Sequence, residues 1–217
     1  MTATHLLLPA EWEPQAAVLL AWPHEGTDWG PRLLATESSY VALVAAITRF
    51  ERALVCVPDA AVRERAAELA KAGGANMSRA GFIEIPYDDT WLRDSGPVTL
   101  KSGAGHPPAA GTHHRADDDD AGFCLADFRF TGWGGKFGAA RDDALVEGLL
   151  ERDVFRPGIG HARIDWALEG GAIESDGRGT ILTTWRCLHQ RHPDLLREQM
   201  TLQLRESLGA RRVLWLD

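Results

Sequence analysis

The chain carries the stretch Asp88-Asp89-Thr90-Trp91-Leu92-Arg93-Asp94-Ser95-Gly96-Pro97, which places carboxylates, an indole and a guanidinium in one short turn. A helix cannot continue through its end, because Pro97 has no amide proton and disfavours helical angles at Gly96. We therefore expect a fixed loop, the kind of segment in which binding residues concentrate. Carboxylates beside an indole suit either a metal ion or an organic cation.

Composition bounds the kinds of protein this chain can be. It has 217 residues, of which 45% are hydrophobic, enough to bury a core in one domain or two small ones. A net charge of −8 argues against a nucleic-acid partner. Three widely spaced cysteines argue against a disulfide framework. Neither a membrane-spanning apolar run nor a signal peptide is evident, so we expect a cytoplasmic protein without a membrane partner.

Apolar periodicity predicts an α/β protein in which strands and helices alternate. Strands are expected over residues 16–22, 54–57, 82–85, 123–130, 162–166, 172–174, 179–184 and 212–216, and helices over 33–50, 60–71, 139–150 and 194–208. The strands at 172–174 and 179–184 should form a hairpin. Residues 101–122 are rich in Gly, Ala, Pro, His and Asp, and we expect a flexible surface insertion there.

One pattern occurs twice and predicts internal repetition. The helix through Phe50 leads through Arg52 into an apolar strand, and the helix through Leu208 leads through Arg212 into another. Because the second copy stops on its strand, we expect one partial domain over residues 1–217 that is interrupted within its fold. The strand at 212–216 should then have an open edge. We expect either that this edge forms a dimer contact or that the strand is poorly ordered, and the first case would make the protein a homo-oligomer.

Two further motifs combine glycine with a carboxylate or an indole. In Gly132-Trp133-Gly134-Gly135-Lys136 the glycines allow a tight turn and a close approach of the backbone to a ligand. Alternatively, the turn ends a strand and the Trp133 side chain packs in the hydrophobic core. In Leu168-Glu169-Gly170-Gly171 a carboxylate precedes paired glycines where backbones can approach closely, although a solvated hairpin turn is an alternative.

Together the three motifs describe a receptor for a small cationic guanidino compound. Asp94 and Glu169 can accept bidentate hydrogen bonds from a guanidinium, and the indoles of Trp22, Trp91 and Trp133 can cover it. Metal binding is the competitor, but the chain lacks His-x-x-x-His and Cys-x-x-Cys spacings. The histidines of the 101–122 segment, beside Asp117 to Asp120, have no defined ligand spacing either; we expect no metal and no cofactor.

These motifs resemble those of the agmatine deiminase family, which also includes the bacterial type of peptidyl-arginine deiminase. The similar segments are Leu8-Pro9-Ala10-Glu11-Trp12-Glu13-Pro14, Trp22-Pro23, Asp89 to Pro97, Gly132 to Lys136, Leu168 to Gly171 and Asp176-Gly177-Arg178-Gly179-Thr180. They occur in the family's order and cover almost the whole chain apart from the insertion.

The resemblance implies a pentein fold, a propeller of ββαβ units, and a cofactor-free hydrolase of C–N bonds in linear amidines. The implied reaction converts agmatine into N-carbamoylputrescine and ammonia, a step towards putrescine. A cysteine attacks the guanidinium carbon, a histidine transfers protons and carboxylates hold the substrate. By position, Asp94 and Glu169 resemble active-site carboxylates and Trp91 a substrate-packing residue. Trp22, Asp89 and Trp133 resemble residues of the site wall.

The chain also departs from the family. The family's Gly-His-Ile/Val-Asp and Gly-Gly-Asn-Ile-His-Cys segments are absent, and Cys187 beside His189 is expected to be a structural thiol. We therefore expect the 217-residue chain alone to be inactive. The alternatives are a non-catalytic guanidino-binding module, a peptidyl-arginine deiminase fragment, and a metal-dependent hydrolase. The last would use Asp88, Asp89 and Asp94 with the histidines of the 101–122 segment.

Overall fold

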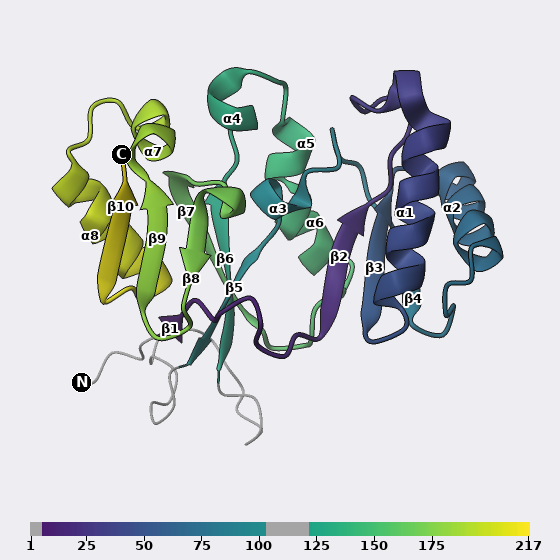
Figure 1. Cartoon of the computed structure of the whole chain (residues 1–217), viewed down its shortest axis with the longest axis horizontal. Coiled ribbons are helices and arrows are strands. Elements are labelled where there is room, and N and C mark those ends of the chain that lie inside the picture. The colour runs from purple at the N-terminus through teal and green to yellow at the C-terminus, as the bar shows by residue number, and fades with distance from the viewer. Residues whose placement is uncertain (1–5, 103–121) are drawn as a thin grey trace. The chain divides into compact units, whose positions relative to one another are not determined.

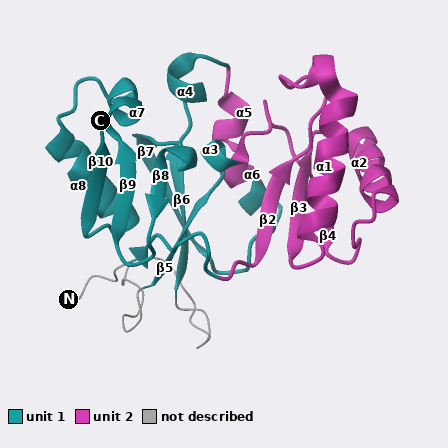
Figure 2. Cartoon of the chain, in the orientation of Figure 1, with its two compact units in different colours: residues 1–13, 93–137, 149–217 teal, residues 14–92, 138–148 magenta. Residues whose placement is uncertain are grey.

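The computed structural model describes residues 6–102 and 122–217, which form two compact units (Figure 1). Figure 2 colours unit 1 (residues 1–13, 93–137 and 149–217) and unit 2 (residues 14–92 and 138–148). The prediction of one partial domain over the whole chain stays a prediction. Of the expected insertion, Lys101 and Ser102 belong to a strand, and residues 103–121 lie outside the described part.

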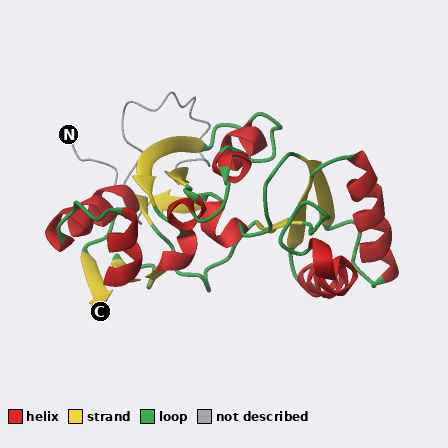
Figure 3. Ribbon diagram, turned by 90° about the horizontal axis from the view of Figure 1, so that it is seen from above, coloured by secondary structure: helices red, strands yellow, loops and turns green. Residues whose placement is uncertain are grey.

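Unit 2 is built on a parallel three-stranded sheet in the order β2-β3-β4. Its elements are β2 (Ala17–Ala21), η1 (Gly30–Arg32), α1 (Leu33–Ile47), β3 (Arg52–Val57), α2 (Ala60–Ala72), β4 (Ala80–Glu84) and α5 (Ala140–Asp143). Helices α1 and α2 connect neighbouring parallel strands and lie on one face of this sheet (Figure 3). Asp59 caps α2, since its Oδ1 accepts a 2.9 Å hydrogen bond from the Val62 amide.

Unit 1 contains two sheets. The first, in the order β1-β5-β6-β7, consists of β1 (Leu6–Leu7), β5 (Val98–Ser102), β6 (Phe123–Arg129) and β7 (Gly160–Ala167). The second, in the order β10-β9-β8, consists of β8 (Ile173–Ser175), β9 (Thr180–Thr184) and β10 (Arg212–Leu216). The hairpin between β8 and β9 is confirmed, and β10 is an edge strand, as expected.

The same chain order occurs in both sheets of unit 1. β8 pairs antiparallel with β9, and β9 pairs parallel with β10 after the helices α7 (Trp185–Arg191) and α8 (Arg197–Leu208). β5 pairs antiparallel with β6, and β6 pairs parallel with β7, again with helices between them in the sequence. The chain therefore has a mixed α/β fold in which a ββαβ order is used twice, in segments other than the helix–strand pair at Phe50 and Arg52 that the sequence suggested.

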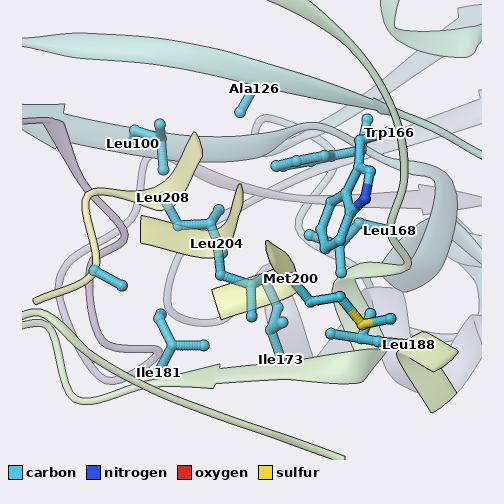
Figure 4. Packing of buried hydrophobic residues seen from close by; sticks show 12 residues of the cluster. Leu100, Ala126, Trp166, Leu168, Ile173, Ile181, Leu188, Met200, Leu204 and Leu208 are labelled. Carbon is cyan, nitrogen blue, oxygen red and sulfur yellow. The ribbon is translucent and has the colours of Figure 1, made fainter. Parts of the chain in front are cut away.

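Helix α8 supplies much of the core of unit 1 (Figure 4). Met200, Leu204 and Leu208, at helical spacing on one face, are each at most 1% exposed. They pack with Ile181 of β9 and Leu100 of β5 in one cluster. Helix α8 thus joins both sheets of the unit.

Several predicted boundaries differ from those of the structure. The loop at residues 90–97 contains one helical turn, α3 (Leu92–Ser95), which ends before Gly96 as Pro97 requires. The helix expected over 139–150 is two short helices, α5 and α6 (Leu145–Leu150). Helix α7 was not predicted, and its N-cap Thr184 makes no side-chain capping bond that would have marked it.

Candidate active site

Asp94, in α3, has a carboxylate that is fixed by two donors from distant parts of unit 1. The indole Nε1 of Trp133 donates to Oδ2 at 2.9 Å, and the amide of Gly171 donates to Oδ1 at 2.9 Å. The residue is half-buried. Since each carboxylate oxygen has two lone pairs, both oxygens can accept a further hydrogen bond. Asp94 is thus a pre-oriented anion with remaining acceptor capacity.

The paired glycines after Glu169 allow this arrangement. A Cβ at Gly171 would overlap Oδ1 of Asp94, and a Cβ at Gly170 would overlap the carbonyl oxygen of Arg93. The predicted close backbone approach at this motif is therefore confirmed. Gly170 begins the short helix η2 (Gly170–Ala172).

Trp133 reaches Asp94 from a left-handed turn, α4 (Gly132–Gly135). Trp133 itself has φ 57°, which is uncommon for a residue with a side chain, and its glycine neighbours also have positive φ. The hydroxyl of Thr131 accepts a 3.0 Å bond from the Gly134 amide and closes the turn. The indole packs edge-to-face on Phe130 and Phe137, at centroid distances of 5.2 and 5.7 Å. The predicted tight glycine turn is confirmed, and it places the Trp133 N–H on Asp94.

Glu169 is only 3% exposed and has a partner that the sequence did not indicate. Nε of Arg191, in α7, donates to its Oε1 at 2.6 Å, and both side chains are buried. The other oxygen, Oε2, is buried and has no hydrogen-bond partner among the described residues. A buried carboxylate oxygen without a donor is costly, so Oε2 suits a ligand N–H.

Cys187 lies close enough to this cluster to interact with it electrostatically. Burial raises the pKa of its thiol, and the nearby carboxylates of Glu169 and Asp94 raise this pKa further, against the opposing effect of Arg191. The ring of His189 stacks on Trp185 at a centroid distance of 4.6 Å. These features fit the expected structural thiol rather than an activated Cys–His pair.

The other three predicted site residues belong to unit 2. Trp91 is 41% exposed, and its ring lies 5.8 Å from that of Trp29. The Trp29 indole N–H donates to Oγ1 of Thr90 at 2.7 Å, which fixes the residue preceding Trp91. Asp89 accepts a 2.7 Å bond from the Thr90 amide and a 3.4 Å bond from the Asp28 amide. The predicted substrate contacts of Asp89 and Trp91 stay predictions.

Trp22 is fully buried in the core of unit 2. Its Nε1 donates to Oε1 of Glu37 at 3.3 Å, and Arg65 holds the same carboxylate through bonds of 2.7 and 2.5 Å. The carbonyl of Trp22 accepts a 2.5 Å bond from the Tyr87 hydroxyl. Its indole therefore has a packing role, and the predicted contact with a substrate stays a prediction.

Sequence reasoning missed Asp142, which organises the Asp88-Asp89 turn. Its Oδ1 accepts bonds of 2.7 and 3.3 Å from the amides of Asp88 and Asp89. Burial raises the pKa of Asp142 to about 6, and the charges of Asp88 and Asp89 raise it too. The amide of Arg141 donates in turn to Asp88 at 2.8 Å. The turn is held in place from the start of α5.

Among the described residues, no group of three or more His, Cys, Asp and Glu side chains is arranged to hold a metal ion. Of the metal ligands that the sequence suggested, Asp88 and Asp89 lie in unit 2 and Asp94 lies in unit 1. The histidines of the insertion and Asp117 to Asp120 lie outside the described part. No helix in the described ranges is long and apolar enough to cross a bilayer.

The chain is similar to known deiminases along nearly its whole length. It is 32% identical over 216 residues to an agmatine deiminase of Stutzerimonas stutzeri, and 30% identical over 215 residues to that of Medicago truncatula. Each alignment covers 96% of this chain but only 52% and 53% of the relatives, so the chain spans about half the length of these curated proteins.

Solved structures of agmatine deiminases have the same fold over this region. A C. jejuni agmatine deiminase variant with substrate bound superposes with a TM-score of 0.80 at 27% identity, covering 98% of this chain and 56% of that one. The Enterococcus faecalis enzyme gives a TM-score of 0.73 at 26% identity, with 99% and 55% covered. The family model of the Porphyromonas-type peptidyl-arginine deiminases matches residues 7–217. The chain therefore belongs to the Porphyromonas-type peptidyl-arginine deiminase family.

Proposed function

We propose that this chain provides the guanidinium-recognition part of an agmatine deiminase, a hydrolase of C–N bonds. The whole enzyme would use water to convert agmatine into N-carbamoylputrescine and ammonia. The names of the relatives support this substrate, and the observation that carries the proposal is the carboxylate of Asp94, held by Trp133 and Gly171. The two ββαβ sheets further support a pentein propeller as the fold of the whole protein.

The chemistry of the cluster suits a guanidinium. This group is planar, always charged and presents five N–H donors, and a pre-oriented carboxylate can pair with it through two parallel bonds. Asp94 supplies that carboxylate, and the orphan Oε2 of Glu169 supplies one more acceptor. We further propose Trp91 and Asp89 as substrate-binding residues, as their positions in the family motifs imply, and assign the fully buried Trp22 a packing role.

We also propose that the 217-residue chain binds the substrate without turning it over. Deiminase chemistry of this type needs a thiolate nucleophile. Burial raises the pKa of both Cys124 and Cys187, which disfavours their thiolate forms, and Cys56 is fully buried and inaccessible to a substrate.

Calorimetric titration of the purified chain with agmatine tests the binding claim. We expect saturable binding that Asp94→Asn weakens by about 100-fold, because the charge-assisted bidentate contact is lost. Putrescine, which has an amine in place of the guanidinium, is the matched control ligand and should bind much more weakly. Equal affinities for agmatine and putrescine would refute guanidinium recognition, and sustained ammonia release from agmatine would refute the inactive-chain claim.

The family name supports one alternative substrate, an arginine residue within a peptide. N-acetyl-arginine amide has the same guanidinium but replaces the free amine of agmatine with two amide groups. If this compound bound more tightly than agmatine, the substrate assignment would move to peptidyl-arginine. Tighter binding of agmatine would support the reading from the curated relatives.

A further inference from the structure

Arg191 is a buried cation next to the candidate active site of unit 1. Its side chain is 6% exposed, and its Nε donates to Oε1 of Glu169, whose side chain is 4% exposed, at 2.6 Å. A charge is tolerated at such depth only when an opposite charge compensates it. Arg191 and Glu169 therefore depend on each other.

Arg191 also lies beside the turn that carries Trp133. A Cβ at Gly134 would lie 3.2 Å from Nη1 of Arg191, so the absence of a side chain at this position makes room for the guanidinium. The neighbouring Trp133 donates to Asp94. Arg191 thus lies between Glu169, with which it forms a hydrogen bond, and the α4 turn, whose Trp133 forms one with Asp94.

The charges of this cluster bear on what it can bind. Asp94 and Glu169 contribute two negative charges, and Arg191 neutralises the one that is almost fully buried. Lys136 is exposed, so solvent screens its charge. The remaining charge is that of Asp94, which matches a single guanidinium. Arg191 also donates to one oxygen of Glu169, so Oε2 is the oxygen that has no donor among the described residues.

We propose that Arg191 is a positioning residue, which compensates the charge of Glu169 and holds this carboxylate with Oε2 towards the ligand. The inference rests on the proposed guanidinium recognition. It assigns the ionic pairing of the substrate to Asp94, and it assigns to Glu169 a single hydrogen bond whose direction Arg191 fixes.

The test compares Arg191→Met, Arg191→Lys, Glu169→Gln and the double variant Arg191→Met/Glu169→Gln in the 217-residue chain. Arg186→Met is the matched control, because Arg186 is an exposed arginine of the same helix. Agmatine affinity is measured by calorimetry between pH 6 and pH 8, and stability is measured by urea unfolding.

We expect Arg191→Met to raise the Kd for agmatine about tenfold and to lower the urea midpoint, because a buried carboxylate is left uncompensated. That carboxylate should bind a proton, so agmatine affinity should increase with pH more steeply than in the wild type. Arg191→Lys should restore part of the affinity. In the double variant the excess pH dependence should vanish and the urea midpoint should recover, since no unpaired charge remains.

Three results would overturn the inference. The first is an Arg191→Met variant that binds agmatine as tightly as the wild type. The second is an Arg191→Met substitution that changes the Kd and the urea midpoint equally with and without Glu169→Gln. The third is a loss of stability in Arg191→Met with no change in the pH dependence of binding, which would make Arg191 merely structural. Urea unfolding needs no ligand, so it measures the coupling between Arg191 and Glu169 even if agmatine does not bind. Failure of the wild type to bind agmatine would therefore refute the proposed function without deciding whether the two residues are coupled.

Discussion

The indole N–H of Trp133 and the Oδ2 of Asp94 lie 2.9 Å apart and form a hydrogen bond across 39 positions of the sequence. Trp133 can make this bond because its own backbone is left-handed, with φ 57°, inside a turn of glycines. Local strain of this kind persists only where surrounding contacts compensate for it. Here the contacts are the hydrogen bond to Asp94 and the packing on Phe130 and Phe137.

Trp133→Phe should separate the hydrogen bond from the packing, because Phe keeps an aromatic ring but has no N–H. A hydrogen bond to a charged group contributes about 1.5–3 kcal/mol. We therefore expect the Kd for agmatine to rise about tenfold in calorimetry, since Asp94 is no longer held in one orientation. Trp12→Phe is the control, because Trp12 is 78% exposed. An unchanged Kd in Trp133→Phe would show that Gly171 alone orients the carboxylate.

Gly171→Ala should displace Asp94 directly. The new Cβ would overlap Oδ1, so either the carboxylate or the backbone of η2 has to move. We expect a loss of about 1–3 kcal/mol in the free energy of unfolding, typical of overpacking. Agmatine binding should weaken at least as much as in Trp133→Phe. The control Gly138→Ala adds a methyl group where no atom lies within 4 Å, and should change neither quantity.

Cys187→Ala should leave agmatine binding within twofold of the wild type. The thiol lies near Glu169 and Asp94, but its pKa is raised, mainly by burial, so it stays protonated. The same property predicts that iodoacetamide alkylates Cys187 at pH 7 more slowly than glutathione, as peptide mass spectrometry can measure. Rapid alkylation, or a large loss of binding in Cys187→Ala, would instead indicate a functional thiol.

Much of the fold could be predicted from local patterns in the sequence. The end of α2 follows from Gly73, and the hairpin of β8 and β9 from the turn residues before Gly179. The close approach at Gly170 and Gly171 agrees with one of the two interpretations of this motif, since a solvated hairpin turn was the alternative. These features depend on residues adjacent in the chain.

Features that depend on tertiary contacts could not be predicted in this way. Arg191 and Asp142 look like ordinary surface charges in the sequence, yet one pairs with Glu169 and the other holds the Asp88-Asp89 turn. Their burial follows from how distant segments pack, which a single sequence does not reveal. The burial of Trp22 was not evident from its family motif either, since its indole is fully buried.

Asp142→Asn should change how stability depends on pH. The folded-state pKa of Asp142 is about 6, raised from 3.8, so the folded state binds this proton more tightly than the unfolded state does. The stabilisation of the fold by this tighter proton binding is therefore complete below about pH 4, and it is lost as the pH rises through 6. An amide oxygen at this position can still accept from Asp88 and Asp89 but carries no charge. We expect Asp142→Asn to be more stable than the wild type at pH 7.5 by about 1–3 kcal/mol.

Urea unfolding from pH 4 to pH 8 checks this expectation, and the difference between variant and wild type should grow across pH 4–6. The exposed Glu147→Gln serves as the control for removing a negative charge from the same region of the chain. A difference that is constant with pH would mean that Asp142 acts through its hydrogen bonds alone.

Trp22→Phe decides between the packing role of this residue and its predicted contact with a substrate. The substitution removes the N–H that donates to Glu37 and part of a side chain with no exposed surface. We expect a loss of about 1–3 kcal/mol in the free energy of unfolding and no change in the Kd for agmatine. Arg65→Met provides the comparison, since it leaves the buried Glu37 without its cation and should also lower the free energy of unfolding. A tenfold rise of the Kd in Trp22→Phe, with unfolding unchanged, would instead place the indole at the ligand.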